Sequence, residues 1–301
     1  MKTVRTVEGL RAVLAPARRE GLAIGLVPTM GALHEGHLSL IRHARRQCDR
    51  VVVSLFVNPS QFNEGSDLER YPRNEERDAV LAEQAGADIL FAPSVEEVYP
   101  QGFATSVEVL GVTERLEGAS RGSEHFRGVA TVVTKLLCMT LPDMAYFGQK
   151  DAQQVVVIRR LVEDLNLPVR IEALPTVREP DGLAMSSRNA LLNPQDRARA
   201  LALSAALDSA SNLVQAGEGS AGAILESAQA TMHRHGVEAE YVALVDLDTL
   251  EPLEQLSDRG LLAIAARVGS VRLIDNTILQ ADPASDSSQQ PTGKAIPTCS
   301  V

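Results

Sequence analysis

The chain has 301 residues, of which 45% are hydrophobic and 23% charged, and these ordinary globular values allow two domains with a substantial core. Its formal net charge is −10, which argues against nucleic-acid binding because such proteins normally carry a basic excess. The three cysteines are too few and too scattered for a disulfide framework or a thiolate metal site, and no uncharged apolar run approaches the roughly 18 residues of a membrane span.

The first half of the chain alternates short apolar runs with longer amphipathic stretches. The apolar runs predict strands at 22–29, 51–57, 87–92, 144–147 and 169–177, and the amphipathic stretches predict helices at 36–47, 75–85, 129–139 and 152–165. The first four runs are continuously apolar, which is typical of strands buried on both faces of a parallel sheet. This alternation predicts an α/β fold with a doubly wound, Rossmann-like sheet over residues 1–177, in which ligands bind at the carboxyl ends of strands.

The pattern changes near residue 177. Two long helical patterns follow, at 194–215 and 221–235, and then strand-like runs at 239–246, 261–268 and 271–279. We therefore expect a smaller α+β domain over residues 178–281 that closes over an active site in the first domain. Residues 282–301 are rich in Ser, Pro and Gln and have no apolar period, which predicts a disordered tail.

Several short motifs do not have the context that their chemistry requires. The G-x-G-x-x-G pattern at 217–222 lies between two predicted helices, and the G-x-S-x-G pattern at 118–122 does not follow a buried strand. His34 and His37 are one residue too close for a zinc-protease motif, so no metal site is predicted from them. The N-terminal 21 residues carry charges throughout and lack an apolar core, so we expect no signal peptide and a cytoplasmic protein.

The first predicted strand runs into Pro28–His37 (PTMGALHEGH), directly before a predicted helix. Gly31 and Gly36 permit close approach of the backbone to a ligand, and the N-terminus of the new helix supplies unpaired N–H groups that suit a phosphate. His34 and His37 are three residues apart and so lie on one side of the first helical turn. Two imidazoles at this place can donate hydrogen bonds to oxygens whose charge grows during phosphoryl transfer.

Three more polar clusters lie at expected strand ends or at the domain junction. After the strand at 144–147, Lys150 offers a compact charge for a phosphate and Asp151 could cap the next helix or hold a ribose hydroxyl, while Gln154 lies one turn farther along. The stretch at 177–189 (VREPDGLAMSSRN) concentrates hydroxyls beside an arginine, which suits a loop that closes over a triphosphate. Gln61, after another strand, could hold a hydroxyl or a carboxylate.

Four stretches carry a resemblance to a known family: VPTMGALHEGHLSL, VVVSLFVNPSQF, HFRGVATVVTKLL with FGQKDAQQ, and REPDGLAMSSRN. Together they resemble the pantothenate synthetase (pantoate–β-alanine ligase) family. They occur in the family's order and spread over about residues 22–193. MGALHEGH with MSSRN is also the pairing of the wider HIGH-type nucleotidyltransferases. The resemblance implies an enzyme that condenses pantoate with β-alanine, using ATP and forming pantothenate, AMP and pyrophosphate through pantoyl adenylate. It further implies Mg²⁺ on the phosphates and a homodimer, with no nucleic acid or membrane as partner.

The same resemblance assigns roles to individual residues. Catalytic roles fall to His34, His37 and Lys150, with His37 in the position of a proton donor, although electrostatic stabilisation of the phosphates explains a histidine there equally well. The implied ATP contacts are Met30, Gly31, His34, Gly36, His37, Gly148, Lys150, Asp151, Val177, Met185, Ser186, Ser187 and Arg188. Gln61 and Gln154 match residues that hold pantoate. Arg121 stands four residues before His125 where the family usually has three, so the predicted site omits it.

Two other functions stay open from the sequence alone. Another HIGH-type adenylyltransferase, acting on a different carboxylate or on a nucleotide, would explain His34, His37 and the segment 186–188 but would give Gln61 and Gln154 no role. The acidic net charge argues against a tRNA partner for such an enzyme. A non-catalytic ATP-binding module would bind nucleotide without releasing AMP, and it would leave the set of phosphate-contacting side chains unexplained.

Overall fold

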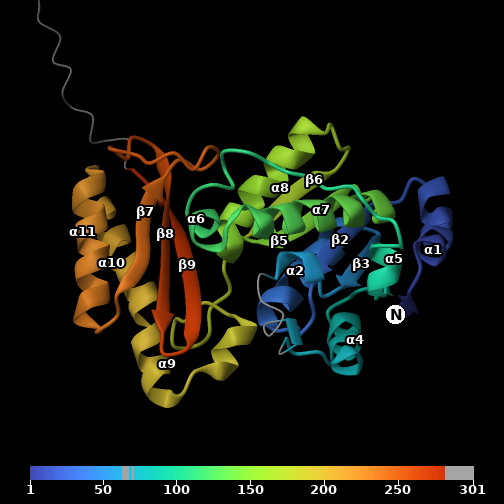
Figure 1. Ribbon diagram of the computed structural model, residues 1–301, viewed down its shortest axis with the longest axis horizontal. Helices are drawn as coiled ribbons and strands as arrows, with labels where there is room; N and C mark the ends of the chain where they lie inside the picture. Colours follow the sequence, from blue (N-terminus) through green and yellow to red (C-terminus); the bar gives the residue numbers. More distant parts are fainter. Residues whose placement is uncertain (63–67, 70, 282–301) are drawn as a thin grey trace, which may run out of the picture.

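Two separate β-sheets organise the chain (Figure 1). The computed structural model describes residues 1–62, 68–69 and 71–281, so the predicted tail at 282–301 lies outside the described residues. The first sheet has six strands in the order β1-β4-β3-β2-β5-β6, and all its pairs are parallel. Its strands are β1 (Lys2–Val4), β2 (Ile24–Thr29), β3 (Arg50–Leu55), β4 (Ile89–Phe91), β5 (Met144–Gly148) and β6 (Arg170–Leu174).

Helices cover both faces of this parallel sheet. They are α1 (Val7–Arg19), α2 (Glu35–Gln47), α4 (Glu75–Gln84), α5 (Val95–Val98), α6 (Glu117–Arg121), α7 (Ser123–Thr140) and α8 (Ala152–Asp164), with 3-10 turns η1 (Pro59–Gln61) and η2 (Gln149–Asp151). In β3, Val51 and Val53 pack with α2 and α4, whereas Val52 packs with α1, α7 and α8. Because side chains alternate between faces along a strand, the continuous apolar run is buried on both sides. The predicted doubly wound α/β fold is confirmed.

The strand order of the parallel sheet reverses at β2, which pairs with β3 on one side and with β5 on the other. The chain leaves β2 into α2 on one face of the sheet, and it leaves β5 through η2 into α8 on the opposite face. The two connections therefore diverge and leave a crevice between them. In open α/β sheets this is the place where ligands bind.

The second sheet has three antiparallel strands, β7 (Ala239–Val245), β8 (Arg259–Val268) and β9 (Val271–Gln280), in that order. With it belong η3 (Ser187–Leu191), α9 (Pro194–Ala200), α10 (Ala202–Gln215) and α11 (Ala221–Arg234). Figure 1 shows α10 and α11 on one side of this sheet and the parallel-sheet part on the other. Leu262 and Ile264 of β8 pack with α10 and α11, whereas Leu261 and Ala263 join the apolar cluster of the first part. The sheet is thus buried on both faces, and the smaller α+β part is confirmed, while its boundary at residue 177 stays a prediction.

Most predicted elements are present, and the differences have local causes. Strand β1 was not predicted, because a three-residue edge strand is too short to show a period. The helical pattern at 194–215 is divided into α9 and α10 at Leu201, whose backbone angles (φ −62°, ψ −13°) stay near helical values and so leave the apolar period intact. The rejected G-x-S-x-G pattern lies on α6, and the rejected G-x-G-x-x-G pattern lies between α10 and the first turn of α11.

Candidate active site

A cavity of about 820 Å³ lies at the crevice between the carboxyl ends of β2 and β5, and β9 of the second sheet forms part of its wall. The predicted site residues that line it are Met30, His34, Gly36, His37, Gln61, Gly148, Lys150, Asp151, Gln154, Val177, Met185, Ser186, Ser187 and Arg188. Gly31 instead borders a separate cavity of about 540 Å³ behind the same loop. Arg121, which the prediction omitted because of its spacing, does line the main cavity. Side chains from four separate stretches of sequence therefore meet in one place.

The loop after β2 ends in two histidines that cap the next helix. The His34 Nδ1 accepts a hydrogen bond from the Gly36 N–H at 3.2 Å, and the His37 Nδ1 accepts one from the His34 N–H at 3.3 Å. The two ring centroids are 4.1 Å apart. Because each Nδ1 accepts, each neutral ring carries its proton on Nε2 and can donate from there. A Cβ at position 36 would lie 2.9 Å from the His34 Cε1, so this arrangement of rings requires glycine.

Burial favours the neutral form of both histidines. Burial lowers the pKa of His37 to about 3, and the adjacent His34 ring acts in the same direction. The pKa of His34 is also lowered, first by burial and then by the positive charge of Lys150. With a pKa this low, the protonated imidazolium is scarcely populated near pH 7, so His37 is a poor general acid. Its neutral ring can still donate a hydrogen bond to a phosphate oxygen. The engaged Nδ1 and the lowered pKa together favour electrostatic stabilisation over proton donation for His37.

A buried carboxylate holds the loop that precedes the histidines. Asp78, on α4, is 1% exposed, and its two oxygens accept hydrogen bonds from the N–H groups of Ala32 at 2.8 Å and Leu33 at 2.9 Å. Gly31 and Ala32 have φ values of +93° and +50°, in the left-handed region that non-glycine residues rarely adopt. The carboxylate therefore stabilises a strained turn. It also engages the N–H groups of Ala32 and Leu33, so these two groups are already paired within the protein.

The turn η1 carries Gln61 and is fixed from two directions. Asn58, 1% exposed, donates from Nδ2 to the Gln61 Oε1 and to the Gly128 carbonyl, both at 3.1 Å. The His125 Nδ1 lies 2.8 Å from the Gln61 carbonyl oxygen. Helix α7 crosses so close to this turn that a Cβ on Gly128 would lie 2.3 Å from the Ser60 carbonyl oxygen. Gln61 is therefore positioned by a helix that begins more than sixty residues later in the chain.

The segment that follows β6 folds back on itself beside the cavity. The Met185 N–H donates to the Val177 carbonyl at 2.9 Å, so these two residues lie side by side. The Ser186 side chain caps η3 by accepting from the Arg188 N–H at 3.3 Å. The predicted nucleotide contacts of this stretch are thereby brought onto one wall of the cavity.

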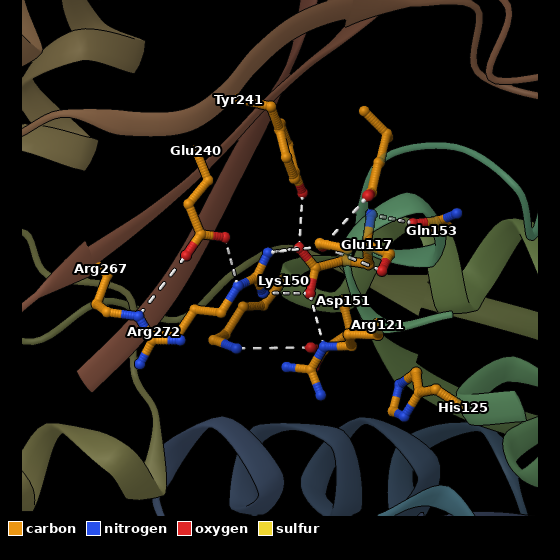
Figure 2. A network of polar contacts seen from close by, with 12 residues as sticks. Glu117, Arg121, His125, Lys150, Asp151, Gln153, Glu240, Tyr241, Arg267 and Arg272 are labelled. Atoms are coloured by element: carbon orange, nitrogen blue, oxygen red, sulfur yellow. Dashed lines mark hydrogen bonds and ion pairs between the residues drawn. The ribbon is translucent and has the colours of Figure 1, made fainter. Parts of the chain in front are cut away.

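Charged side chains of α6 and of the second sheet meet at another part of the cavity wall (Figure 2). Glu117, on α6, accepts from both terminal nitrogens of Arg272 at 2.6 and 2.8 Å, from the Tyr241 hydroxyl at 2.9 Å and from the Arg121 Nε at 3.0 Å. Arg272 also donates from Nε to Glu240 at 2.7 Å. Burial alone would raise the pKa of Glu117, but the hydrogen bonds and charge of Arg272 outweigh it and lower that pKa. This cluster joins α6 to the second sheet.

Lys150 lies at the edge of this charged cluster, beside Asp151 (Figure 2). Its Nζ is 3.5 Å from the Asp151 Oδ1, and its side chain is 18% exposed. Within residues 1–62, 68–69 and 71–281, no three His, Cys, Asp or Glu side chains are grouped to hold a metal ion. None of the helices in the described part of the chain is long and apolar enough to cross a membrane.

Several residues that shape the site are not indicated by the sequence. They are Asn58, Asp78, Glu117 and His125, together with Arg121, whose spacing argued against it. A signal was available for His125, since it begins the HFRGV stretch that carried part of the resemblance. For Asp78 and Glu117 no local signal exists, because acidic residues on amphipathic helices normally face solvent.

Comparison with known proteins gives a consistent result. The family model described as pantoate-beta-alanine ligase matches residues 2–278. A pantothenate synthetase of Moorella thermoacetica is 54% identical over 281 residues, covering 93% of this chain and 99% of that protein. One from Cereibacter sphaeroides is 54% identical over 273 residues, covering 91% and 98%.

Solved structures agree with this result. The pantothenate synthetase of Thermus thermophilus superposes with a TM-score of 0.87 at 46% identity, covering 92% of this chain and 99% of that one. The pantoate-beta-alanine ligase of Francisella tularensis, solved with Beta-gamma ATP and Beta-alanine, gives 0.77 at 34% identity, covering 94% and 100%. The chain belongs to the pantoate-beta-alanine ligase family, and the amide-forming ligase function that the sequence motifs implied is confirmed.

Proposed function

We propose that this ligase condenses pantoate with β-alanine in two steps within the single cavity described above. In the first step the pantoate carboxylate attacks the α-phosphorus of ATP, and the bond to the β-phosphate oxygen breaks, releasing pyrophosphate and forming pantoyl adenylate. In the second step the β-alanine amine attacks the acyl carbon, AMP leaves and the amine loses a proton, which gives pantothenate. The observation that carries this proposal is the meeting of phosphate-binding and acid-binding side chains around one space of about 820 Å³.

One wall of the cavity suits the triphosphate. Lys150 supplies a positive charge, Ser186 and Arg188 supply donors, and the His34 and His37 rings supply neutral Nε2–H groups. Negative charge on the phosphate oxygens grows as pyrophosphate departs, and donors held in place before the reaction stabilise it without reorganisation. We expect His37 to act in this way and not as a proton donor, since its pKa is about 3.

The other wall suits the acid. Gln61 and Gln154 line the same cavity from η1 and from the first turn of α8, and side-chain amides can hold both the hydroxyls and the carboxylate of pantoate. Holding the carboxylate beside the α-phosphorus converts a bimolecular attack into a nearly unimolecular one. Gln61 lies beside His125, at the side where we expect β-alanine to enter.

We also propose magnesium as a companion of ATP. Magnesium usually binds through one or two carboxylates together with substrate phosphates and water, so the absence of a ready three-ligand group among the described residues does not argue against it. Asp151, whose side chain is 51% exposed next to Lys150, is the carboxylate that would hold it. The bound ion would neutralise charge on the phosphates.

The proposed assembly is a cytoplasmic homodimer. Light scattering coupled to gel filtration should give twice the 32.3 kDa mass of the chain. A mass of one chain at micromolar concentration would contradict this part of the proposal.

A product analysis tests the reaction. Purified protein with ATP, magnesium, pantoate and β-alanine should form AMP, pyrophosphate and pantothenate in equal amounts, as followed by mass spectrometry. Omission of pantoate should abolish AMP formation. Turnover with a nucleotide monophosphate or another carboxylate, and none with pantoate, would instead identify a different adenylyltransferase.

A further inference from the structure

Strand β9 of the second sheet contacts the turn that carries Lys150. The Asn276 Nδ2 donates hydrogen bonds to the carbonyl oxygens of Gln149 at 3.0 Å and of Lys150 at 2.8 Å. The Gln149 side chain returns a bond from Nε2 to the Asn276 Oδ1 at 3.4 Å. Asn276 is 5% exposed, so its amide is largely shielded from solvent. One amide group thus holds two successive backbone carbonyls of η2.

The turn needs such a support because it has little of its own. It is a three-residue 3-10 turn, and neither it nor the following helix α8 has a side-chain hydrogen bond at its N-cap. Short 3-10 turns have poorer hydrogen-bond geometry than α-helices and hold their residues less firmly. The position of the Lys150 backbone therefore depends on contacts from outside the turn, and Asn276 provides two of them.

Neighbouring residues of β9 hold other parts of the same cavity. Asp275, 3% exposed, forms a two-point ion pair with Arg178 at 2.6 and 3.1 Å, and Arg178 begins the folded-back segment that leads to Met185. Arg272 holds Glu117 of α6, as Figure 2 shows. Successive side chains of a strand point to opposite sides, so Asp275 and Asn276 can reach different segments. One strand of the second sheet thereby fixes three parts of the wall.

We propose that Asn276 is a positioning residue for adenylate formation: it fixes the backbone of Gln149 and Lys150 and so sets the Lys150 ammonium at the phosphate side of the cavity. This inference rests on the proposed role of Lys150. Its chemistry requires an amide in particular. A carboxylate of the same shape would place an acceptor oxygen, in the position of Nδ2, against the carbonyl oxygens of Gln149 and Lys150 and would repel the turn.

The substitution Asn276→Asp tests this requirement. The assay is pantoate-dependent exchange of labelled pyrophosphate into ATP, measured with magnesium between pH 6 and pH 8. We expect exchange at pH 8 to fall by about 10- to 100-fold, the usual loss when a supporting residue of a site is removed. As the pH falls, the introduced carboxyl becomes protonated and regains one O–H donor, and burial raises its pKa toward the assay range. The ratio of variant to wild-type rate should therefore rise toward pH 6.

Two further variants separate positioning from a general effect on folding. Asn212→Asp, an exposed change on α10 away from the cavity, makes the same chemical alteration and should leave the exchange rate and its pH profile unchanged. Asn276→Ala removes both donors without adding charge, and it should lower the exchange rate of the otherwise wild-type enzyme. In the Lys150→Ala variant the same change should lower the rate by less than about threefold, because Asn276 acts through Lys150.

Each outcome decides the question. A pH-dependent loss with Asn276→Asp, combined with non-additive effects of Asn276→Ala and Lys150→Ala, supports the positioning role. Wild-type exchange in Asn276→Asp at every pH, or fully multiplicative effects in the double variant, overturns it. Failure of the wild-type enzyme to exchange pyrophosphate at all would overturn the proposed function instead, so the two failures are distinguishable.

Discussion

Gly128 allows helix α7 to lie against the turn that carries Gln61, and Gly128→Ala should therefore damage the acid-binding wall. The added Cβ would lie 2.3 Å from the Ser60 carbonyl oxygen and 2.9 Å from the Gln61 nitrogen, whereas ordinary van der Waals contact begins at 3.4 Å. Helix or turn must move by about 1 Å to relieve this contact. In an enzyme, a displacement of about 1 Å can lower the rate by about 100-fold.

The effect on stability is a balance of two terms. Replacing glycine by alanine inside a helix favours folding by about 1 kcal/mol, while overpacking a closely packed contact costs about 1–3 kcal/mol. We therefore expect Gly128→Ala to lose at most about 2 kcal/mol of unfolding free energy while losing about 100-fold in pantoate-dependent pyrophosphate exchange. Urea unfolding and the exchange assay, run on the same preparation, measure both quantities.

A matched control is available on α11. Gly222 is also helical, but the nearest atom to a Cβ there is the Ser220 Oγ at 3.7 Å, so Gly222→Ala should leave activity unchanged and stability equal or slightly raised. Undiminished exchange in Gly128→Ala would refute the argument that the contact between α7 and η1 positions Gln61. Equal losses in both variants would refute it as well.

Three more perturbations follow from buried groups at the site. Asp78→Ala leaves the N–H groups of Ala32 and Leu33 without their acceptor. The unfolding free energy should therefore fall by about 2–3 kcal/mol, and pyrophosphate exchange should fall by at least about tenfold. Urea unfolding that matches the wild type would rule out the role of Asp78 in holding the loop. Glu117→Gln weakens the ion pair with Arg272, and calorimetry should show a loss of about 2 kcal/mol of unfolding free energy. An unchanged Tm would exclude this coupling of α6 to the second sheet. Folding lowers the pKa of His37 from 6.5 to about 3. Between these two pH values the unfolded chain binds a proton that the folded chain does not bind. The stabilising contribution of the neutral ring is therefore present above pH 6.5 and is lost as the pH falls toward 3. Between pH 7 and pH 4, the Tm of the wild type should therefore fall more steeply than the Tm of His37→Gln. Parallel curves of Tm against pH would contradict the assigned burial of His37.

The fold was largely predictable because the strands of the parallel sheet are buried on both faces. The run from Val51 to Val57 is apolar at nearly every position, and the structure places alternate valines in two different clusters. A signal of that strength indicates a strand regardless of its tertiary neighbours. The three-residue strand β1 lacks such a run and was missed, since its pairing with β4 is a property of the assembled sheet.

The candidate site was predictable where its residues form short local motifs in the sequence. The loop before α2, the turn η2 and the segment around Met185 each follow a strand or a domain junction, and the rule that ligands bind at carboxyl ends of parallel strands places them together. The residues that hold these loops in place have no such local signal. Asn276 reaches η2 across more than 120 positions of sequence, and nothing near Asn276 in the sequence indicates its partner.

Arg121 illustrates a limit of spacing arguments. Its distance from His125 in the sequence differs from the family pattern, which suggested that it would not reach the cleft. In the structure Arg121 ends α6, and Glu117, one helical turn earlier, holds its Nε. The residue lines the cavity because a helix and an ion pair, and not the count of residues to His125, set its position.

The most direct test of the two-step account is the exchange of labelled pyrophosphate into ATP by purified protein with magnesium and pantoate, in the absence of β-alanine. Reversible formation of pantoyl adenylate predicts exchange that requires pantoate, and later addition of β-alanine should convert the accumulated adenylate into pantothenate and AMP. Exchange that proceeds without pantoate, or that appears only when β-alanine is present, would contradict a separate adenylation step at this cavity.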